Sequence, residues 1–180
     1  MVSDRQNIAA GTQQPEKFDV IIVGAGISGI GSATLLRKHC PDLSFAILEA
    51  LEGHGGTWLI HKYPGTRSDS DLFTFGYGFK PWTGQPIASR DQILDYLGDA
   101  IADAGLGPFI RYGHSVTSAN WSNETASWQL TVERKGADDV VQMEASFLWM
   151  CQGYYRHEKG YTPQWPGMDR FKGQIIHPQH

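Results

Sequence analysis

The chain has 180 residues, of which 41% are hydrophobic, enough for one domain with a core of ordinary size. Its formal net charge is -4 and no run of Lys or Arg stands out, which argues against a nucleic-acid-binding surface and a polybasic membrane patch. The two cysteines, Cys40 and Cys151, lie outside any CxxC pair, so the sequence predicts free thiols and neither a metal site nor a disulfide framework.

The start of the chain is polar. Residues 1–17 are rich in Gln, Asn, Ser and Thr and contain no apolar signal-peptide core, so we expect a disordered lead-in. Apolar runs such as residues 20–23 are far too short to span a bilayer. These features predict a cytoplasmic protein without a membrane span.

A βαβ unit follows the lead-in. Residues 18–23 (FDVIIV) predict a buried parallel strand, because the run is apolar and contains β-branched residues. Residues 27–39 predict a helix that Pro41 ends, and residues 44–48 (SFAIL) predict a second strand. The apolar face of the helix is expected to consist of Ile30, Ala33, Leu35 and Leu36. This order and length are those of a dinucleotide-binding fold.

The region from residue 53 to about residue 85 is dense in Gly, Pro, Trp and Tyr and shows no helical or strand period. A loop of this length inside a domain is unusual and is often functional. Residues 90–104 then predict an amphipathic helix, with Ser89 as its N-cap and Gly105 as its C-terminal stop.

The second half of the chain is expected to form short strands. Four segments alternate or nearly alternate between apolar and polar residues and are separated by turn signals, which predicts a β-meander. They are residues 110–116, 119–122, 128–133 and 140–145. Residues 147–151 (FLWMC) predict a further buried strand, and residues 154–180 predict an irregular segment.

The sequence GAGISG at residues 24–29 is a GxGxxG motif between a predicted strand and a predicted helix. Gly24 would allow a sharp turn, Gly26 a close approach to a pyrophosphate, and Gly29 close packing of helix and strand. The start of the helix would offer unpaired N–H groups and partial positive charge to the phosphates. Glu49, twenty residues after Gly29, would bind ribose hydroxyls and repel a 2′-phosphate, so this site suits FAD or NAD better than NADP.

The sequence GGTW at residues 55–58 lies just past Glu49. Its backbone N–H groups and the Thr57 hydroxyl are expected to reach further phosphates or a flavin edge. The alternative is a glycine turn in which Trp58 serves as an anchor.

Several motifs together resemble the Baeyer–Villiger monooxygenases, which are class B flavin monooxygenases. The first are GAGISG, Glu49, GGTW and the sequence YPGTRSDSD at residues 63–71. CQGYY at residues 151–155 is similar to the motif that closes the first FAD-binding segment of the family. FKGQIIH at residues 171–177 matches the first part of the family fingerprint FxGxxxHxxxW. The chain most resembles the subgroup that contains the ethionamide-activating mycobacterial monooxygenase.

This resemblance implies roles for individual residues. The residues expected to bind FAD are Gly24, Gly26, Ser28, Gly29, Glu49, Gly56, Thr57, Trp58 and Val116. Those expected to approach the nicotinamide cofactor, NADPH, are Arg67, Ser68 and Asp69. Asp69 would act in catalysis by orienting an arginine near the isoalloxazine, and the alternative is a solvated loop acid. Val116 would contact the adenine or be only a buried strand residue, and His177 would couple domain motion to catalysis.

The resemblance also implies the fold and the organisation of the chain. We expect an α/β protein, namely a Rossmann-like FAD-binding fold of three layers with a β-meander, incomplete at its C-terminal side. Residues 18–153 would form the N-terminal segment of the FAD-binding domain, and residues 154–180 a linker towards a missing NADPH domain. The second GxGxxG motif and the catalytic arginine of the family are not found in these 180 residues.

The implied activity is an NADPH- and O2-dependent oxidation of a ketone to an ester, or of a sulfide or an amine. One alternative is a non-catalytic FAD- or nucleotide-binding module that a partner chain completes. A second is a small NAD-dependent dehydrogenase, although such a fold does not need the GGTW and YPG sequences.

Overall fold

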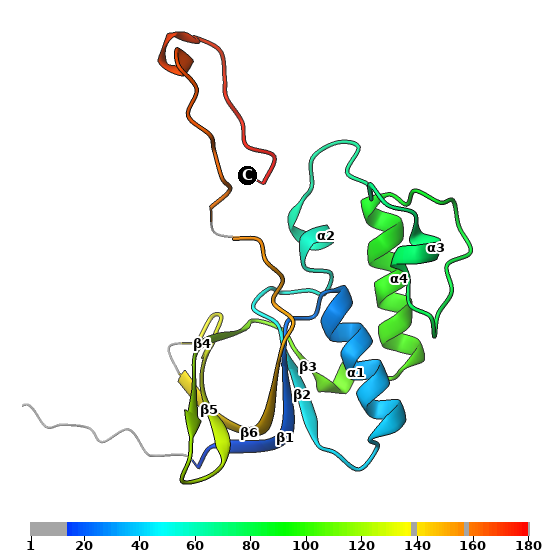
Figure 1. Cartoon of the computed structure of the whole chain (residues 1–180), viewed down its shortest axis with the longest axis vertical. Coiled ribbons are helices and arrows are strands. Elements are labelled where there is room, and N and C mark those ends of the chain that lie inside the picture. Colours follow the sequence, from blue (N-terminus) through cyan, green and yellow to red (C-terminus); the bar gives the residue numbers. More distant parts are fainter. Residues whose placement is uncertain (1–13, 138–139, 157–158, 180) are drawn as a thin grey trace, which may run out of the picture.

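The structure is a computed structural model that describes residues 14–137, 140–156 and 159–179 (Figure 1). Residues 1–13, which make up most of the expected lead-in, lie outside the described residues. Glu16 and Lys17, also expected in that lead-in, instead form the first residues of strand β1. In the described part of the chain, no helix is long and apolar enough to cross a membrane.

A six-stranded mixed sheet organises the chain, with the strand order β3-β2-β1-β6-β5-β4. Its strands are β1 (Glu16–Val23), β2 (Phe45–Leu48), β3 (Ile110–Arg111), β4 (His114–Ser122), β5 (Ser127–Arg134) and β6 (Val140–Met150). The pairs among β3, β2, β1 and β6 are parallel, and β6, β5 and β4 pair antiparallel. Both the parallel βαβ unit and the meander are therefore confirmed.

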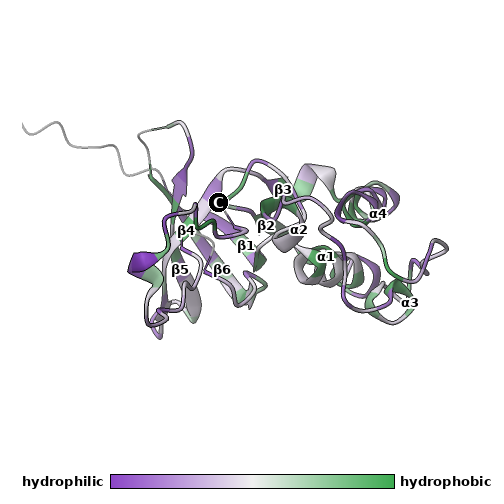
Figure 2. Cartoon of the chain, turned by 90° about the horizontal axis from the view of Figure 1, so that it is seen from above, coloured by the Kyte–Doolittle hydropathy of each residue, from purple (hydrophilic) through white to green (hydrophobic). Residues whose placement is uncertain are grey.

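Strand β1 is buried on both faces and separates two apolar cores. Val20 and Ile22 belong to a core shared with helices α1 (Ile27–His39) and α4 (Arg90–Asp103). Ile21 points the other way, into a core shared with the meander strands. Because side chains alternate along a strand, one short apolar run holds three layers together. Figure 2 shows the meander, the parallel strands and the helices in succession, which confirms the three-layer fold.

Helix α1 has the bounds predicted for it, but its buried face differs in one residue. Ile30, Ala33 and Leu36 are buried as expected, whereas Leu35 is exposed over 45% of its surface. Three residues make almost one turn, so positions 30, 33 and 36 share a face that position 35 leaves.

The aperiodic loop contains two single-turn helices that the sequence did not predict, α2 (Thr57–Ile60) and α3 (Leu72–Phe75). Helix α4 starts as predicted at Ser89, whose side chain accepts a hydrogen bond from the Gln92 N–H. Gln92 returns a hydrogen bond to the Ser89 N–H, which completes a capping box.

Three strand boundaries differ from the prediction. The segment 110–116 is interrupted at Gly113, which has a φ of +66° and lets the chain turn between β3 and β4. The segment 119–122 joins the residues before it as one strand, β4, with a bulge between Val116 and Ser118. The segments 140–145 and 147–150 lie on a single strand, β6, which pairs with β5 over residues 140–145 and with β1 over residues 143–150.

Outside the sheet and the longer helices there are two 3-10 turns, η1 (Gly107–Phe109) and η2 (Met168–Arg170). Beyond β6 the chain leaves the sheet as an extended segment that contains η2 (Figure 1).

The capping box generates a prediction about stability. Ser89→Ala removes the acceptor for the Gln92 N–H, so we expect the free energy of unfolding to fall by about 1 kcal/mol in urea denaturation. Ser118→Ala, an exposed serine on β4, is the matched control and is expected to change it by less than about 0.5 kcal/mol. Equal effects of the two substitutions would show that the cap does not stabilise α4.

Candidate functional site

The turn between β1 and α1 is packed too closely for side chains at two of its glycines. Gly24 has a φ of +106°, and a Cβ there would lie 2.5 Å from the carbonyl oxygen of Cys151. A Cβ on Gly29 would lie 1.8 Å from the carbonyl oxygen of Gly24. These two glycines therefore let β1, α1 and the end of β6 approach one another.

Gly26 differs from these two because a Cβ on it would meet only the Cα of Gly56, at 3.9 Å. Gly26 is the N-cap of α1, where no side chain accepts a hydrogen bond from the helix. The first turn of α1 also contains no acidic residue. Its N–H groups and partial positive charge are thus available to an anion beside Gly26.

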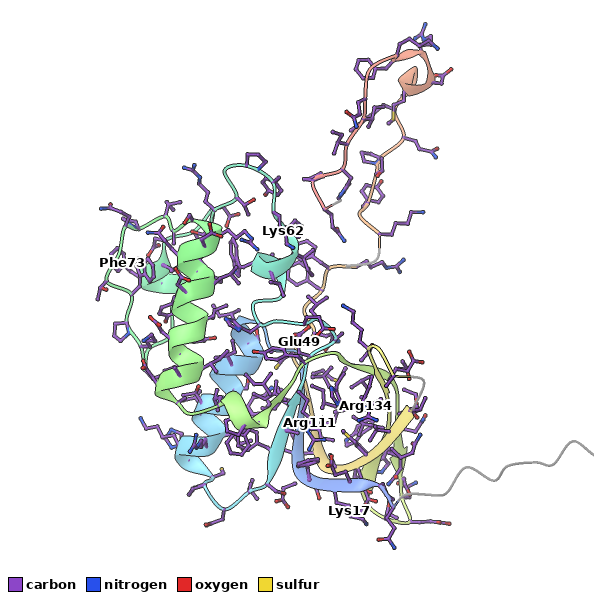
Figure 3. The ribbon with its side chains drawn as sticks, turned by 180° about the vertical axis from the view of Figure 1, so that it is seen from behind. Lys17, Glu49, Lys62, Phe73, Arg111 and Arg134 are labelled. Atoms are coloured by element: carbon purple, nitrogen blue, oxygen red, sulfur yellow. The ribbon has the colours of Figure 1, made fainter. Side chains whose placement is uncertain are left out.

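Glu49, at the carboxyl end of β2, is bonded directly to this turn. Its side chain is part of a residue that is 6% exposed, and one carboxylate oxygen accepts a hydrogen bond from the Ala25 N–H at 2.7 Å. The other oxygen accepts from the Leu51 N–H at 2.9 Å. Each oxygen keeps a further lone pair, so the carboxylate remains able to accept hydroxyl donors. Figure 3 shows Glu49 where the strands meet the helical part of the molecule.

The sequence analysis missed Tyr112, which lies near Glu49, and His54, which contacts Tyr112. Burial raises the pKa of Tyr112, and the charge of Glu49 raises it further, so the phenol stays protonated at neutral pH. The Tyr112 hydroxyl is 3.3 Å from Nδ1 of His54. The signal in the sequence was the position of Tyr112 at the end of β3, because parallel strands end at the same edge of a sheet.

The GGTW segment at residues 55–58 lies next to the β1–α1 turn. The Gly55 N–H donates to the Ala25 carbonyl oxygen at 2.9 Å, and Gly56 is the N-cap of α2. Trp58 packs against the helical core and contacts Phe75 edge to face, with ring centroids 6.3 Å apart. Trp58 is thus anchored on the helical core.

The predicted residues 67–69 do not face one site. Ser68 is buried, and its hydroxyl has no hydrogen-bond partner among the described residues. Arg67 and Asp69 on either side of it are exposed. A hydrogen bond with Tyr154 raises the pKa of Tyr155, and the charge of Asp69 adds to this shift. Asp69 therefore lies near the tyrosines that follow β6, and Ser68 points into the protein.

Three predicted FAD-binding residues remain, namely Ser28, Thr57 and Val116. Ser28 is exposed in the first turn of α1, and Thr57 is half-buried as the first residue of α2. Val116 is half-buried on β4 and packs against the core shared with the meander.

Two cavities open near the loop that follows α2. The larger, of about 780 Å³, lies between the residues after Glu49, α2 and the extended C-terminal segment. Its lining residues are Leu51, Glu52, Gly53, Leu59, Ile60, Lys62, Tyr63, Pro64, Ile176, Pro178 and Gln179. The smaller, of about 460 Å³, lies between residues 62–67 and the start of α4. Asp69 lines neither of these two cavities.

Residues 14–137, 140–156 and 159–179 include no cluster of three or more His, Cys, Asp or Glu side chains that could hold a metal ion.

Comparison with known proteins finds a family model and several curated relatives that are similar to this chain. A family model for the NAD(P)-binding Rossmann-like domain matches residues 22–97. The FAD-containing monooxygenase EthA of Mycolicibacterium smegmatis is 51% identical over 166 residues, which are 92% of this chain and 33% of that protein. EthA of Mycobacterium tuberculosis is 46% identical over the same share of this chain and 34% of its own length. The probable FAD-binding monooxygenase AlmA of an Acinetobacter species is also 46% identical, covering 92% of this chain and 33% of that protein.

Solved structures of monooxygenases are also similar to this chain. An oxidized steroid monooxygenase bound to NADP matches 91% of this chain and 31% of its own, with a TM-score of 0.73 and 31% identity. The open structure of cyclohexanone monooxygenase matches 91% of this chain and 32% of its own, with a TM-score of 0.75 and 26% identity. The chain spans about a third of the length of the curated relatives it matches.

The glycine geometry generates a prediction about stability. Gly29→Ala places a Cβ 1.8 Å from a backbone oxygen, so we expect the free energy of unfolding to fall by roughly 1–3 kcal/mol or more. Gly26→Ala meets nothing closer than 3.9 Å and should change it by less than about 0.5 kcal/mol. Thermal or urea unfolding of the two variants measures both values, and equal stability would contradict the close approach of α1 to the turn.

Proposed function

We propose, on the premise that this chain is homologous to the FAD-containing monooxygenases along 92% of its length, that it binds FAD as part of a flavin-dependent monooxygenase. The adenosine diphosphate half of FAD would lie over the β1–α1 turn. The observation on which this proposal rests is the hydrogen bond from the Ala25 N–H to the Glu49 carboxylate. This hydrogen bond holds Glu49, the proposed ribose-binding residue, beside the turn from which α1 begins.

The residues present fit such a dinucleotide in three respects. Gly26 and Gly56 approach each other without side chains, so a ligand over the helix start would meet backbone at both positions. The α1 N-terminus has no side-chain cap, so its N–H groups remain available to a diphosphate. Glu49 keeps lone pairs for the two ribose hydroxyls, and its charge disfavours a 2′-phosphate. FAD meets all three conditions, and NADPH does not meet the last.

NADPH would therefore be the second cofactor, bound outside the β1–α1 turn. The 180 residues contain one GxGxxG motif, and the chain spans about a third of its relatives' length. Structures similar to this chain include the OTEMO complex with FAD and NADP, which matches 93% of this chain with a TM-score of 0.71 and 28% identity. We propose that residues 154–180 lead towards the part that binds NADPH.

When bound, FAD supplies the electron-transfer and oxygen chemistry, and the protein binds and orients it. We propose that Gly24, Gly26, Ser28, Gly29, Gly56 and Thr57 surround the diphosphate, that Trp58 anchors α2 beside it, and that Val116 borders the adenine. Arg67 and Asp69 would approach NADPH from the exposed side of their loop. Asp69 would act in catalysis by orienting an arginine near the isoalloxazine, and its exposed carboxylate is available for such a partner.

The proposed substrate is a ketone, a sulfide or an amine, and O2 is the co-substrate. Support comes from the similarity to cyclohexanone and steroid monooxygenases. The proposed enzyme works in the cytoplasm, where the free thiols of Cys40 and Cys151 would stay reduced.

A titration with FAD tests the proposal, because bound flavin changes its fluorescence. Glu49→Gln replaces a charged acceptor by a neutral one and is expected to weaken FAD binding about 10- to 100-fold. Glu133→Gln, an exposed glutamate on β5, is the matched control and should bind FAD as tightly as the unaltered chain. Equal FAD affinity of the Glu49→Gln variant and this control would contradict the assigned site.

Gly26→Ala tests the diphosphate half of the same site. The added methyl group would cover backbone that a ligand over the helix start would meet, so we expect FAD binding to weaken by at least about tenfold without loss of folding. The far-ultraviolet circular dichroism of the variant checks the fold. A folded Gly26→Ala variant with unchanged affinity would show that FAD does not approach this backbone.

A further inference from the structure

The cavity of about 460 Å³ is separate from the proposed FAD site. It lies where residues 62–67 cross the start of α4, and it shares no lining residue with the β1–α1 turn or with Glu49. Figure 3 shows Lys62 beside α2 and apart from Glu49. The residues that line it are Lys62, Tyr63, Pro64, Gly65, Thr66, Arg67, Ile87, Ser89, Arg90, Asp91 and Gln92.

The lining of this cavity has an excess of positive charge. Three of its side chains are cationic, namely Lys62, Arg67 and Arg90, and Asp91 is the one acid among them. Asp91 is already paired with Arg90, with 2.6 Å between Oδ1 and Nη1. Lys62 and Arg67 make no ion pair with any residue that the structure describes. Arg67 donates one hydrogen bond, from Nε to the Gly65 carbonyl oxygen. Two positive charges in the cavity are therefore not neutralised by any described residue.

Arg90 itself is only partly satisfied. Its Nη2 lies 3.4 Å from the Leu59 carbonyl oxygen, and its Nε is buried without a hydrogen-bond partner among the described residues. Buried donors in folded proteins nearly always have a partner, so an arginine held in this way needs an explanation. An anion in the cavity would supply negative charge to Lys62 and Arg67, which no described residue neutralises.

Backbone bonds hold the loop that carries Arg67 against the start of α4 before any ligand arrives. Arg67 and Ser89 form a β-bridge, and the Arg90 N–H donates to the Thr66 carbonyl oxygen at 3.0 Å. The Ser68 N–H donates to the Ala88 carbonyl oxygen at 2.9 Å. Because these bonds fix the backbone around Arg67 and Arg90, it would lose little conformational entropy on binding.

We propose that this cavity binds the phosphate group of a small organic phosphate. Two arginines and a lysine suit a dianionic phosphate, because arginine presents paired donors to its oxygens. The volume falls in the range of small-molecule sites and exceeds the need of a bare ion. Tyr63, Pro64 and Ile87 form an apolar part of the wall that would contact the carbon portion of the ligand. The inference does not depend on FAD binding, and of the residues proposed above to approach NADPH only Arg67 lines this cavity.

Calorimetric titration of the full chain with phenyl phosphate and with inorganic phosphate tests this inference. We expect saturable binding of one phenyl phosphate per chain, tighter than that of inorganic phosphate because of the apolar wall. Arg67→Gln should weaken it by roughly tenfold or more. Lys38→Gln is the matched control and should leave it unchanged, because Lys38 lies in the last turn of α1. That end of α1 adjoins the far end of α4, where Arg37 donates to the Gly105 carbonyl oxygen.

A third variant separates this cavity from the FAD site. Gly26→Ala, which obstructs the β1–α1 turn, is expected to bind phenyl phosphate as the unaltered chain does. Loss of binding in Gly26→Ala together with full binding in Arg67→Gln would place the phosphate at the turn and overturn the proposal. An absence of phenyl phosphate binding to the unaltered chain would also overturn the proposal. If inorganic phosphate bound as tightly as phenyl phosphate, the proposal that the ligand is an organic phosphate would be overturned.

Discussion

The hydrogen bond between the Ala25 N–H and the buried Glu49 carboxylate is the interaction on which the proposed site depends. It joins the end of β2 to the turn that begins α1, so the acid and the helix N-terminus keep a fixed relation. A buried carboxylate needs such partners, because an unpaired charge in the interior is costly. The Leu51 N–H supplies the second one. Both bonds use backbone donors, which leaves the outer lone pairs of Glu49 for a ligand.

The close approach of strands and helix at this point follows from glycine. Gly24 and Gly29 leave no room for a side chain, whereas Gly26 and Gly56 approach each other without side chains. Strand β1 positions this turn because each of its faces is buried in a different core, one with the helices and one with the meander. Strand β1, which is buried on both faces, therefore ends in the β1–α1 turn, whose backbone would face the ligand.

Much of this arrangement could be predicted from the sequence, because the signals are local. The apolar run before Gly24, the GxGxxG motif and the Ser89 cap each fix an element within a few residues. The rest depends on contacts between distant residues. A single glycine, Gly113, is a weak turn signal, so the break between β3 and β4 is not predicted from the sequence. The sequence pattern also predicts two strands where the structure has the single strand β6. The cationic cavity joins Lys62 and Arg67 to Arg90 across a loop without periodicity, so no local pattern reveals it.

The central claim is that FAD binds with its diphosphate over the β1–α1 turn and its ribose on Glu49. Amide chemical shifts of the isotope-labelled chain, recorded as FAD is added, test it most directly. The account predicts that the largest changes occur at Ala25, Gly26, Ser28 and Leu51, whose N–H groups surround the proposed site. Saturating shifts confined to other parts of the chain, or no shifts with FAD in excess, would contradict it.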